Sequence, residues 1–305
     1  MIVVSGASGT VGRRVVELLL RHRVEPARIV AVTRTPEQLE GSRGVAVRYG
    51  TFDDPDGLVP LFSHAQRLLL ISTNDVRPGV RVRQHANAVR AAREAHVAHI
   101  GYTSMVRPEE MNPALIAFDH RETERMIVDI PRPWTFLRNN LYAETLVPVA
   151  AQAVETGVLA VNAGDGRVAW VSWEDCAAAA AAWLAHGGRE REAVDVTGPY
   201  DHSYGEVAAI LSDLSGRPVR YEAISDEVAV DAAVAVGVPE EAAASIASFG
   251  QAAREGWFEV VGPQCPGSRP ARARPPGHGP RGSPGRVAAR PGHPDRGARL
   301  GWRPP

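Results

Sequence analysis

The chain begins Met1-Ile2-Val3-Val4-Ser5-Gly6-Ala7-Ser8-Gly9-Thr10-Val11-Gly12. The apolar start predicts a buried strand over residues 2–5. Three glycines then mark a sharp turn, and the run TVGRRVVELLLRH has the apolar spacing of an amphipathic helix over residues 10–22. A strand, a glycine-rich turn and a helix therefore follow one another without a gap.

This order predicts a phosphate site. Glycine lets the backbone turn sharply and lets an anion approach the main chain, and the helix N-terminus presents unpaired N–H groups to it. The spacing is GxxGxxG rather than GxGxxG, so the flanking strand and helix supply the confirming context. The alternative is an ordinary turn between a strand and a helix. The residues expected to bind the diphosphate of a dinucleotide are Gly6, Ser8, Gly9, Thr10, Val11 and Gly12.

Short apolar runs alternate with helical patterns along the first half of the chain. Strands are expected at 2–5, 28–33, 45–49, 68–72, 98–103 and 134–138, and helices at 10–22, 55–63, 80–96 and 114–129. This alternation predicts an α/β fold, a Rossmann-type doubly wound parallel sheet with helices on both faces. The carboxyl ends of its strands then share one edge, where ligands bind.

The pattern becomes less regular after residue 139. We expect helices at 141–156, 173–186, 204–215 and up to 254, a hairpin turning at Asp165-Gly166, and strands at 193–197 and 218–224. The expected domains are a dinucleotide-binding Rossmann domain at 1–156, a small C-terminal α+β substrate lobe at 157–261 with strands returning to the main sheet, and a tail at 262–305.

The tail has its own composition. Residues 262–305 hold nine arginines, one acid, nine glycines and eleven prolines. Such a segment buries too little surface to offset its ordering entropy, so we expect it to be disordered. A shifted reading frame is the favoured origin; a natural solvated tail and a basic nucleic-acid arm are the alternatives. Trp302 is its one aromatic residue, and nucleic-acid binding is not expected.

Composition sets further bounds on the 305 residues. No apolar run is long enough to span a membrane, and the first strand begins at Met1, so we expect neither a membrane segment nor a signal peptide. Cys176 and Cys265 lie far apart without metal-ligand spacing, which fits a reducing cytoplasm and no metal site. All 34 basic residues are arginine. Mechanisms that need a lysine are therefore excluded, including the Tyr-x-x-x-Lys pair, because Val106 stands four residues after Tyr102.

Arg34 follows the second strand, beside the expected adenosine ribose. An acid there would accept the 2′-hydroxyl of NAD, whereas a cation attracts the 2′-phosphate of NADP. Residues 31–36 contain no acid, so we expect NADP(H) in preference to NAD(H). The alternative is a surface arginine at a strand end. Arg13 and Arg14 could assist.

Polar residues also stand at the ends of later strands. Ser72, Thr73, Tyr102 and Thr103 are candidates to bind the cofactor, although such hydroxyls also cap helices.

Three further residues are the expected catalytic groups. His120, with Glu124 one turn later, could donate a proton or bond the cofactor ribose; the alternative is a solvated His–Glu pair. Asn139 has an amide that donates and accepts. Tyr142 could stack on a flat ring or pack in the core.

Several of these stretches together resemble one family. They are SGASGTVGRRVVELLL, VTRTPEQ, LLLISTNDV, HANAVRAAREAHVAHIGYTS, DHRETERMI, WTFLRNNLYAE and AGDGRVAWVSWEDCAAAAA. The chain resembles the NmrA-like atypical short-chain dehydrogenases over residues 1–258, in particular the type 2 NAD(P)H:quinone oxidoreductases and triphenylmethane reductases. The resemblance implies an NADP-binding Rossmann domain and a substrate cleft near His120, Asn139 and Tyr142. Two departures are Thr51, where relatives usually carry an acid near the adenine, and the chain after Val261, which does not match.

The expected function is an NADPH-dependent reductase that passes a hydride to a quinone-like or conjugated small molecule. Quinones suit a site without the Tyr–Lys pair, because their reduced product is a weakly basic oxyanion. Asn139 or Tyr142 would polarise the acceptor carbonyl, and His120 or water would deliver the proton. The alternative is an NmrA-type redox-sensing regulator that binds NADP(H) without turnover. A nucleotide-sugar epimerase is disfavoured, and a homodimer is left open.

Overall fold

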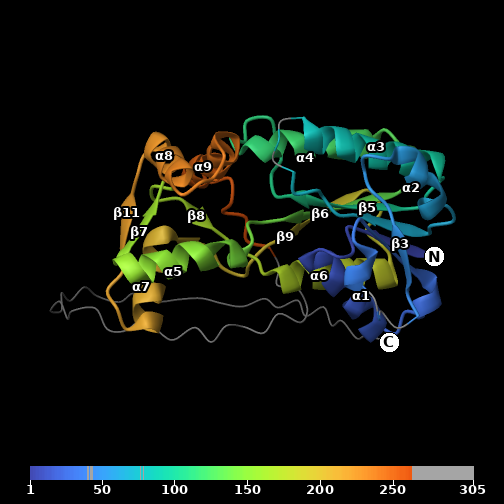
Figure 1. Ribbon diagram of the computed structural model, residues 1–305, viewed down its shortest axis with the longest axis horizontal. Helices are drawn as coiled ribbons and strands as arrows, with labels where there is room; N and C mark the ends of the chain where they lie inside the picture. Colours follow the sequence, from blue (N-terminus) through green and yellow to red (C-terminus); the bar gives the residue numbers. More distant parts are fainter. Residues whose placement is uncertain (40, 42–43, 76, 78, 263–305) are drawn as a thin grey trace, which may run out of the picture. The chain divides into compact units, whose positions relative to one another are not determined.

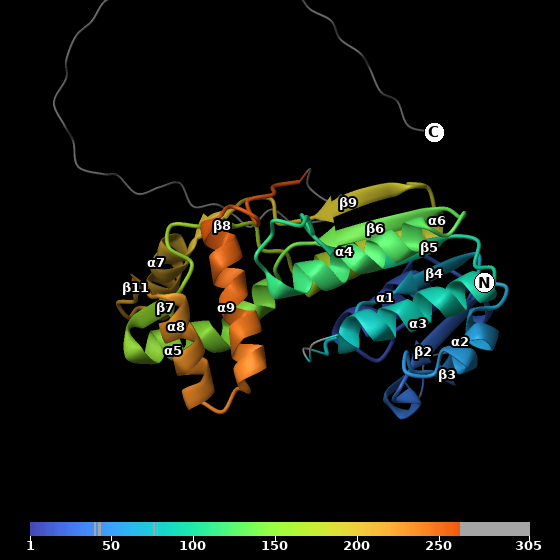
Figure 2. The same ribbon diagram turned by 90° about the horizontal axis from the view of Figure 1, so that it is seen from above.

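The computed structural model describes residues 1–39, 41, 44–75, 77 and 79–262. Within these ranges the early apolar runs become one parallel sheet with the strand order β3-β2-β1-β4-β5-β6-β9 (Figures 1 and 2). Its strands are β1 (Ile2–Ser5), β2 (Ile29–Thr33), β3 (Ala46–Tyr49), β4 (Arg67–Leu70), β5 (Ile100–Met105), β6 (Trp134–Asn139) and β9 (Glu192–Val196). The strand order reverses beside β1, as in a doubly wound fold, which confirms the predicted class.

Helices cover both faces of this sheet (Figure 1). The helices α1 (Thr10–Arg21) and α6 (Trp173–His186) lie on one face. On the other lie α2 (Pro55–Phe62), α3 (Val80–Glu94) and α4 (Leu115–Val128). Strand side chains alternate between the faces, so Val4 joins the cluster under α1 while Val3 joins the cluster under α3.

The alanine-rich helix α6 packs closely on its neighbours, as its composition predicts. Ala177, Ala180 and Ala181 are fully buried between the sheet and α1. Near its end, the Trp183 ring lies directly on the backbone of Gly101 in β5, where an added Cβ would overlap the ring. A small residue in the strand therefore makes room for a large one in the helix.

The remaining elements form a smaller lobe. They are the strands β7 (Val158–Val161), β8 (Arg167–Val168), β10 (His202–Ser203) and β11 (Arg220–Ala223), and the helices α5 (Leu146–Thr156), α7 (Tyr204–Ser215), α8 (Asp226–Ala235) and α9 (Glu240–Arg254). Short 3₁₀ turns occupy η1 (Pro26–Arg28), η2 (Pro36–Leu39) and η3 (Ala143–Thr145).

The predicted hairpin around Asp165-Gly166 is wrong. The strand β7 pairs in parallel with β11, and β8 pairs antiparallel with β10, so the two strands do not pair with each other. The segment between them is held by α9 instead, because the Asn162 side chain donates to the Ala247 carbonyl at 2.7 Å. Gly166 also lies so close to the backbone at Ala253 that a Cβ would collide with it.

The chain returns to the main sheet after α6. The strand β9 pairs in parallel with β6 and places Val196 beside Asn139. Residues 1–262 all belong to one compact unit, and the division at 156/157 remains a prediction. The expected disordered tail lies outside the described residues, apart from Gly262.

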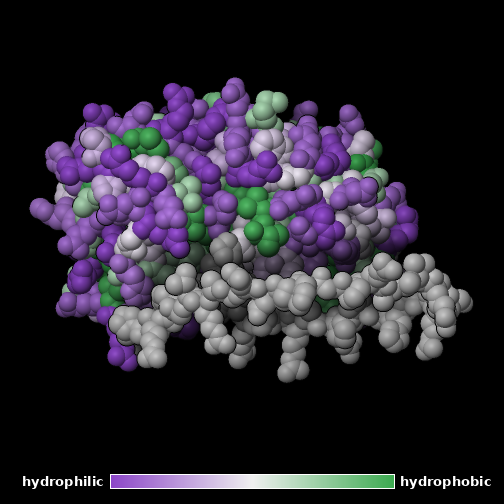
Figure 3. All heavy atoms as spheres, turned by 180° about the vertical axis from the view of Figure 1, so that it is seen from behind, coloured by the Kyte–Doolittle hydropathy of each residue, from purple (hydrophilic) through white to green (hydrophobic). Residues whose placement is uncertain are grey.

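In the part of the chain that the structure describes, no helix is long and apolar enough to cross a membrane. Figure 3 shows one face of the molecule, on which hydrophilic side chains predominate and hydrophobic ones form small separate patches.

Replacing Gly101 by alanine tests the contact with Trp183. We expect the added methyl group to push the ring off β5 and to lower the free energy of unfolding by about 1–3 kcal/mol, the usual cost of overpacking. Urea denaturation measures the change. Gly205→Ala in α7 is the control, because the nearest heavy atom to its Cβ would be 3.7 Å away; equal stability of the Gly101 variant and the wild type would contradict the argument.

Candidate functional site

A cleft of ≈ 430 Å³ lies along the carboxyl edge of the central sheet. The α1 N-terminus forms its floor, and the loops after β2, β3, β4 and β6 form its sides, as the topology predicts. The residues lining it are Gly6, Ser8, Gly9, Thr10, Val11, Gly12, Thr33, Arg34, Gly50, Thr51, Phe52, Ile71, Thr73, Asn74, Gln84, Tyr142 and Trp173.

The glycine turn has the geometry of a phosphate cradle. Gly6 has a φ of +63°, a left-handed conformation that favours glycine. A Cβ on Gly12 would overlap the Gly6 carbonyl, so glycine at 12 lets α1 approach the turn closely. The helix begins after Gly9, and no side chain caps it. Its first N–H groups are therefore left for a ligand in the cleft, and the turn fits a diphosphate.

The end of β2 adds a cation and hydroxyl groups beside the turn. Arg34 is exposed and lines the cleft. The Ser8 hydroxyl lies 2.6 Å from the Thr33 hydroxyl and accepts a hydrogen bond from the Thr35 hydroxyl at 2.9 Å. A guanidinium next to several hydroxyls fits a second phosphate group.

Arg13 and Arg14 do not line this cleft. Both border a separate hollow behind Ser8. The Arg14 guanidinium makes two hydrogen bonds to Glu174 at 2.5 and 2.6 Å, which tie α1 to α6. Arg14 is therefore engaged in a structural contact, while Arg34 faces the cleft.

Tyr142 and Trp173 form the opposite end of the cleft. Their rings meet edge to face with centroids 6.1 Å apart. The Asn139 amide donates to the Tyr142 hydroxyl at 3.1 Å. Burial raises the pKa of Tyr142 above its usual value, so the hydroxyl keeps its proton at neutral pH. Since the oxygen already accepts from Asn139, that proton is available to a ligand.

A buried polar network lies behind the cleft, between α3, β5 and α4. The Arg81 guanidinium donates to His120 Nε2 at 3.4 Å, so the other ring nitrogen of a neutral His120 donates to the Tyr102 hydroxyl at 2.8 Å. In the same way, the Thr73 N–H donates to His85 Nε2 at 3.0 Å, and His85 Nδ1 donates to Thr123 at 2.8 Å. Both histidines are held as the same tautomer.

Burial and the Arg81 charge keep these histidines neutral. They lower the pKa of His85 to about 3 and that of His120 well below its usual value. His120 does not form part of the cleft wall, and Glu124 is buried with a different partner, Arg138, at 2.6 Å. The solvated His–Glu pair is therefore wrong. The catalytic role of His120 remains a prediction, and in this structure it would act through other residues.

The structure brings most of the predicted residues together. Those that line the cleft are Gly6, Ser8, Gly9, Thr10, Val11, Gly12, Arg34, Thr73 and Tyr142. Ser72, Tyr102, Thr103, His120 and Asn139 are not among the residues that line it. Thr103, for example, accepts the Ser72 N–H at 2.9 Å and so joins the segment after β4 to β5.

Sequence reasoning missed several lining residues. Phe52 and Asn74 stand three and two residues after predicted strand ends, which was a usable signal. Trp173 reaches the cleft from a helix far along the chain, and Gln84 lies within a helix. No local pattern marks such positions.

The fold and the cleft define a dinucleotide-binding protein of the Rossmann class. Residues 1–265 match the model of the NmrA-like family, and the chain belongs to that family. It is 34% identical over 258 residues to quinone oxidoreductase 2 of Escherichia coli (84% of this chain, 89% of that protein). It is 31% identical to the NAD(P)H azoreductase of Xenophilus azovorans (80% and 84%).

Solved structures show the same similarity. The NADPH complex of the NADPH-dependent quinone oxidoreductase QOR2 from Escherichia coli matches with a TM-score of 0.80 and 33% identity, over 85% of this chain and 90% of that one. The NADP(H) complex of the triphenylmethane reductase from Citrobacter sp. matches with a TM-score of 0.80 and 34% identity, over 86% and 93%. The resemblance found in the sequence is confirmed.

The low pKa of His85 predicts acid sensitivity. His85 takes up a proton near pH 6.5 when unfolded but near pH 3 when folded, so it contributes stability at neutral pH that is lost as the pH falls between these values. Protonation of His85 alone lowers the free energy of unfolding by about 2 kcal/mol between pH 7 and pH 5. We expect His85→Gln to flatten the pH dependence of the free energy of unfolding by that amount in urea denaturation.

The exposed His22 supplies the control for this experiment. His22→Gln should leave the wild-type slope between pH 7 and pH 5 intact. An unchanged slope in His85→Gln would show that the buried imidazole is not the source.

Proposed function

We propose that this protein is an NADPH-dependent reductase that transfers a hydride to a quinone or a similarly conjugated small molecule. The observation that carries the proposal is the layout of one cleft. It has a phosphate cradle and a cation at one end, and a protonated tyrosine hydroxyl at the other. The quinone oxidoreductase, azoreductase and triphenylmethane reductase relatives support the same chemistry.

The cofactor would lie across the sheet edge with its diphosphate on the glycine turn. Arg34, with the Ser8 and Thr35 hydroxyls, would hold the 2′-phosphate that distinguishes NADP(H) from NAD(H). When bound, the reduced nicotinamide supplies the hydride. Tyr142 and Trp173 line the half of the cleft that this orientation leaves for the nicotinamide and the acceptor.

The acceptor would be held and polarised by Tyr142. The Asn139 amide orients the hydroxyl, which then donates its proton towards an acceptor oxygen as negative charge develops there. His120 has both ring nitrogens engaged behind the wall. We therefore assign proton delivery to Tyr142 or water, and a positioning role to His120. A quinone suits this site, because its reduced oxyanion is weakly basic and needs no lysine.

The cellular compartment of the protein follows from the same proposal. NADPH is a reductant of the cell interior, and the sequence lacks a disulfide framework, so we place the protein in the cytoplasm.

Turnover with NADPH and a panel of benzoquinones and naphthoquinones tests the proposal. We expect oxidation of NADPH in the wild type, followed as loss of its absorbance. Tyr142→Phe should lower kcat by about 10–100-fold, because the variant keeps the ring but lacks the donor. Tyr200→Phe, at a position 54% exposed, is the control. Tight NADPH binding without turnover of any acceptor would favour the redox-sensing regulator instead.

Arg34→Ala tests the cofactor preference. Loss of a charged contact to the 2′-phosphate should weaken NADPH binding by about 10–100-fold and leave NADH binding within about twofold of the wild type. Calorimetric titration with each cofactor measures both effects. The exposed Arg125, on α4, supplies the control as Arg125→Ala. Equal losses for both cofactors would refute the assignment of Arg34 to the phosphate.

A further inference from the structure

Gln84 carries a buried hydrogen-bond acceptor that lacks a partner. It lies on the first half of α3, is 5% exposed and lines the cleft. Its amide nitrogen donates to both oxygens of the Asp53 carboxylate at 3.3 Å. The amide oxygen, Oε1, is buried and has no hydrogen-bond partner among the residues that the structure describes. An acceptor buried in this way is costly, and native proteins rarely leave one without a purpose.

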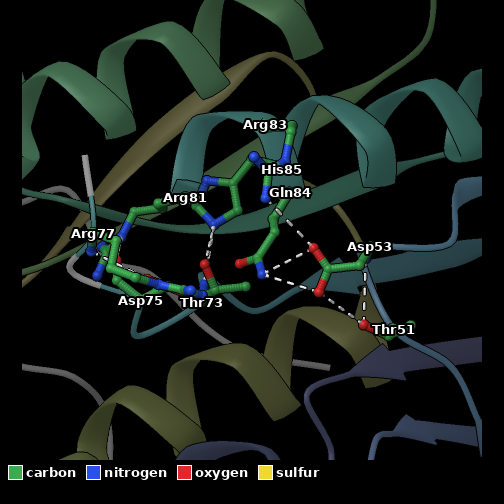
Figure 4. Close-up of polar contacts among 9 residues, drawn as sticks. All are labelled: Thr51, Asp53, Thr73, Asp75, Arg77, Arg81, Arg83, Gln84 and His85. Atoms are coloured by element: carbon green, nitrogen blue, oxygen red, sulfur yellow. Dashed lines mark hydrogen bonds and ion pairs between the residues drawn. The ribbon is translucent and has the colours of Figure 1, made fainter. Parts of the chain in front are cut away.

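The orientation of this amide is fixed by its neighbour. A carboxylate only accepts hydrogen bonds, so the NH₂ group of Gln84 must face Asp53 and the carbonyl must face away. Figure 4 shows this arrangement, in which the carbonyl end points away from Asp53 on the side of Thr73. The Thr51 hydroxyl donates to the same carboxylate at 3.4 Å. Turning the amide over would set its oxygen against the carboxylate, which is repulsive.

The place of Gln84 in the cleft identifies the part of a ligand that it meets. The diphosphate cradle is at the end of β1, and Arg34 at the end of β2 sets the direction of the adenosine. Gly50, Thr51 and Phe52 follow β3, the next strand outward, and the bond from Gln84 to Asp53 ties α3 to this same loop. The base of an adenosine phosphate therefore lies in the part of the cleft that Gln84 borders.

We propose that Gln84 recognises the exocyclic amino group of adenine through Oε1, and that Asp53 is the positioning residue that orients it. The inference rests on the proposed dinucleotide cofactor and names the contact that reads its base. The amino group supplies an N–H donor, which the orphaned oxygen lacks. The two bonds to Asp53, each 3.3 Å long, keep the amide oxygen on the side away from the carboxylate.

The contact predicts discrimination between adenine and hypoxanthine. Hypoxanthine has a carbonyl where adenine has the amino group, and that carbonyl would oppose Oε1. By calorimetry on the full chain, we expect NADPH to bind about tenfold tighter than its hypoxanthine analogue, deamino-NADPH. Gln84→Met keeps the volume but removes the acceptor, so the two cofactors should then bind within about twofold of each other. Asp53→Ala should lose part of the preference, because the amide is no longer oriented.

A second ligand locates the contact within the cofactor. The compound 2′,5′-ADP lacks the nicotinamide half, so Gln84→Met should weaken its binding by the same factor as that of NADPH. Gln152→Met, at an exposed position on α5, should change neither. The proposal is overturned if the wild type binds the two cofactors equally, if Gln84→Met keeps the preference, or if 2′,5′-ADP binds the variant normally.

The preference for adenine over hypoxanthine is measured by binding and does not depend on turnover. A protein that discriminates between the bases but reduces no acceptor would retain the adenine contact and lose the proposed reductase activity. A protein that reduces quinones with either base equally would do the reverse. Failure to bind either dinucleotide would overturn both.

Discussion

The close contact between the first turn of α1 and the backbone of Gly6 is the constraint on which the cleft depends. Any side chain at Gly12 would overlap the Gly6 carbonyl, so this approach exists only because residue 12 is glycine. The contact directs the uncapped N–H groups of α1 at the carboxyl edge of the sheet. It also sets α1 against the buried alanines of α6. A single glycine thus couples the anion site to the packing of one whole face of the sheet.

Charge is distributed unevenly between the cleft and the network behind it. Arg81 is buried, and its nearest carboxylate, on Asp119, is 3.7 Å away. Its charge lowers the pKa of His85 and of His120, which burial already lowers. Two neutral histidines with both nitrogens engaged fix the loop at Thr73 and the Tyr102 side chain, and the one N–H of each ring is already donated within the protein. Unlike these histidines, Tyr142 lines the cleft and keeps its hydroxyl proton at neutral pH, in a chain without lysine.

The parts of this structure that sequence predicted are those set by local periodicity. The glycine turn, the parallel strands and the cleft-lining role of Arg34 follow from residues adjacent in the chain. The hairpin at Asp165-Gly166 was mispredicted because tertiary contacts from α9 hold that segment, and no local pattern records them. The alternative of a solvated pair of His120 and Glu124 fails for the same reason. The helix α4 buries both His120 and Glu124 against partners that are distant in sequence, namely Arg81 and Arg138.

The two halves of the cleft share one unusual feature. Asn139, behind Tyr142, and Gln84, beside Phe52, each use the amide nitrogen in a hydrogen bond and leave the amide oxygen buried without a partner among the described residues. Each such oxygen costs about 1–3 kcal/mol of stability. Only Gln84 borders the cleft, so a ligand there with an N–H or O–H donor would relieve its cost, whereas Asn139 does not line the cleft. The cleft therefore offers such a ligand one unsatisfied acceptor, which is oriented by Asp53.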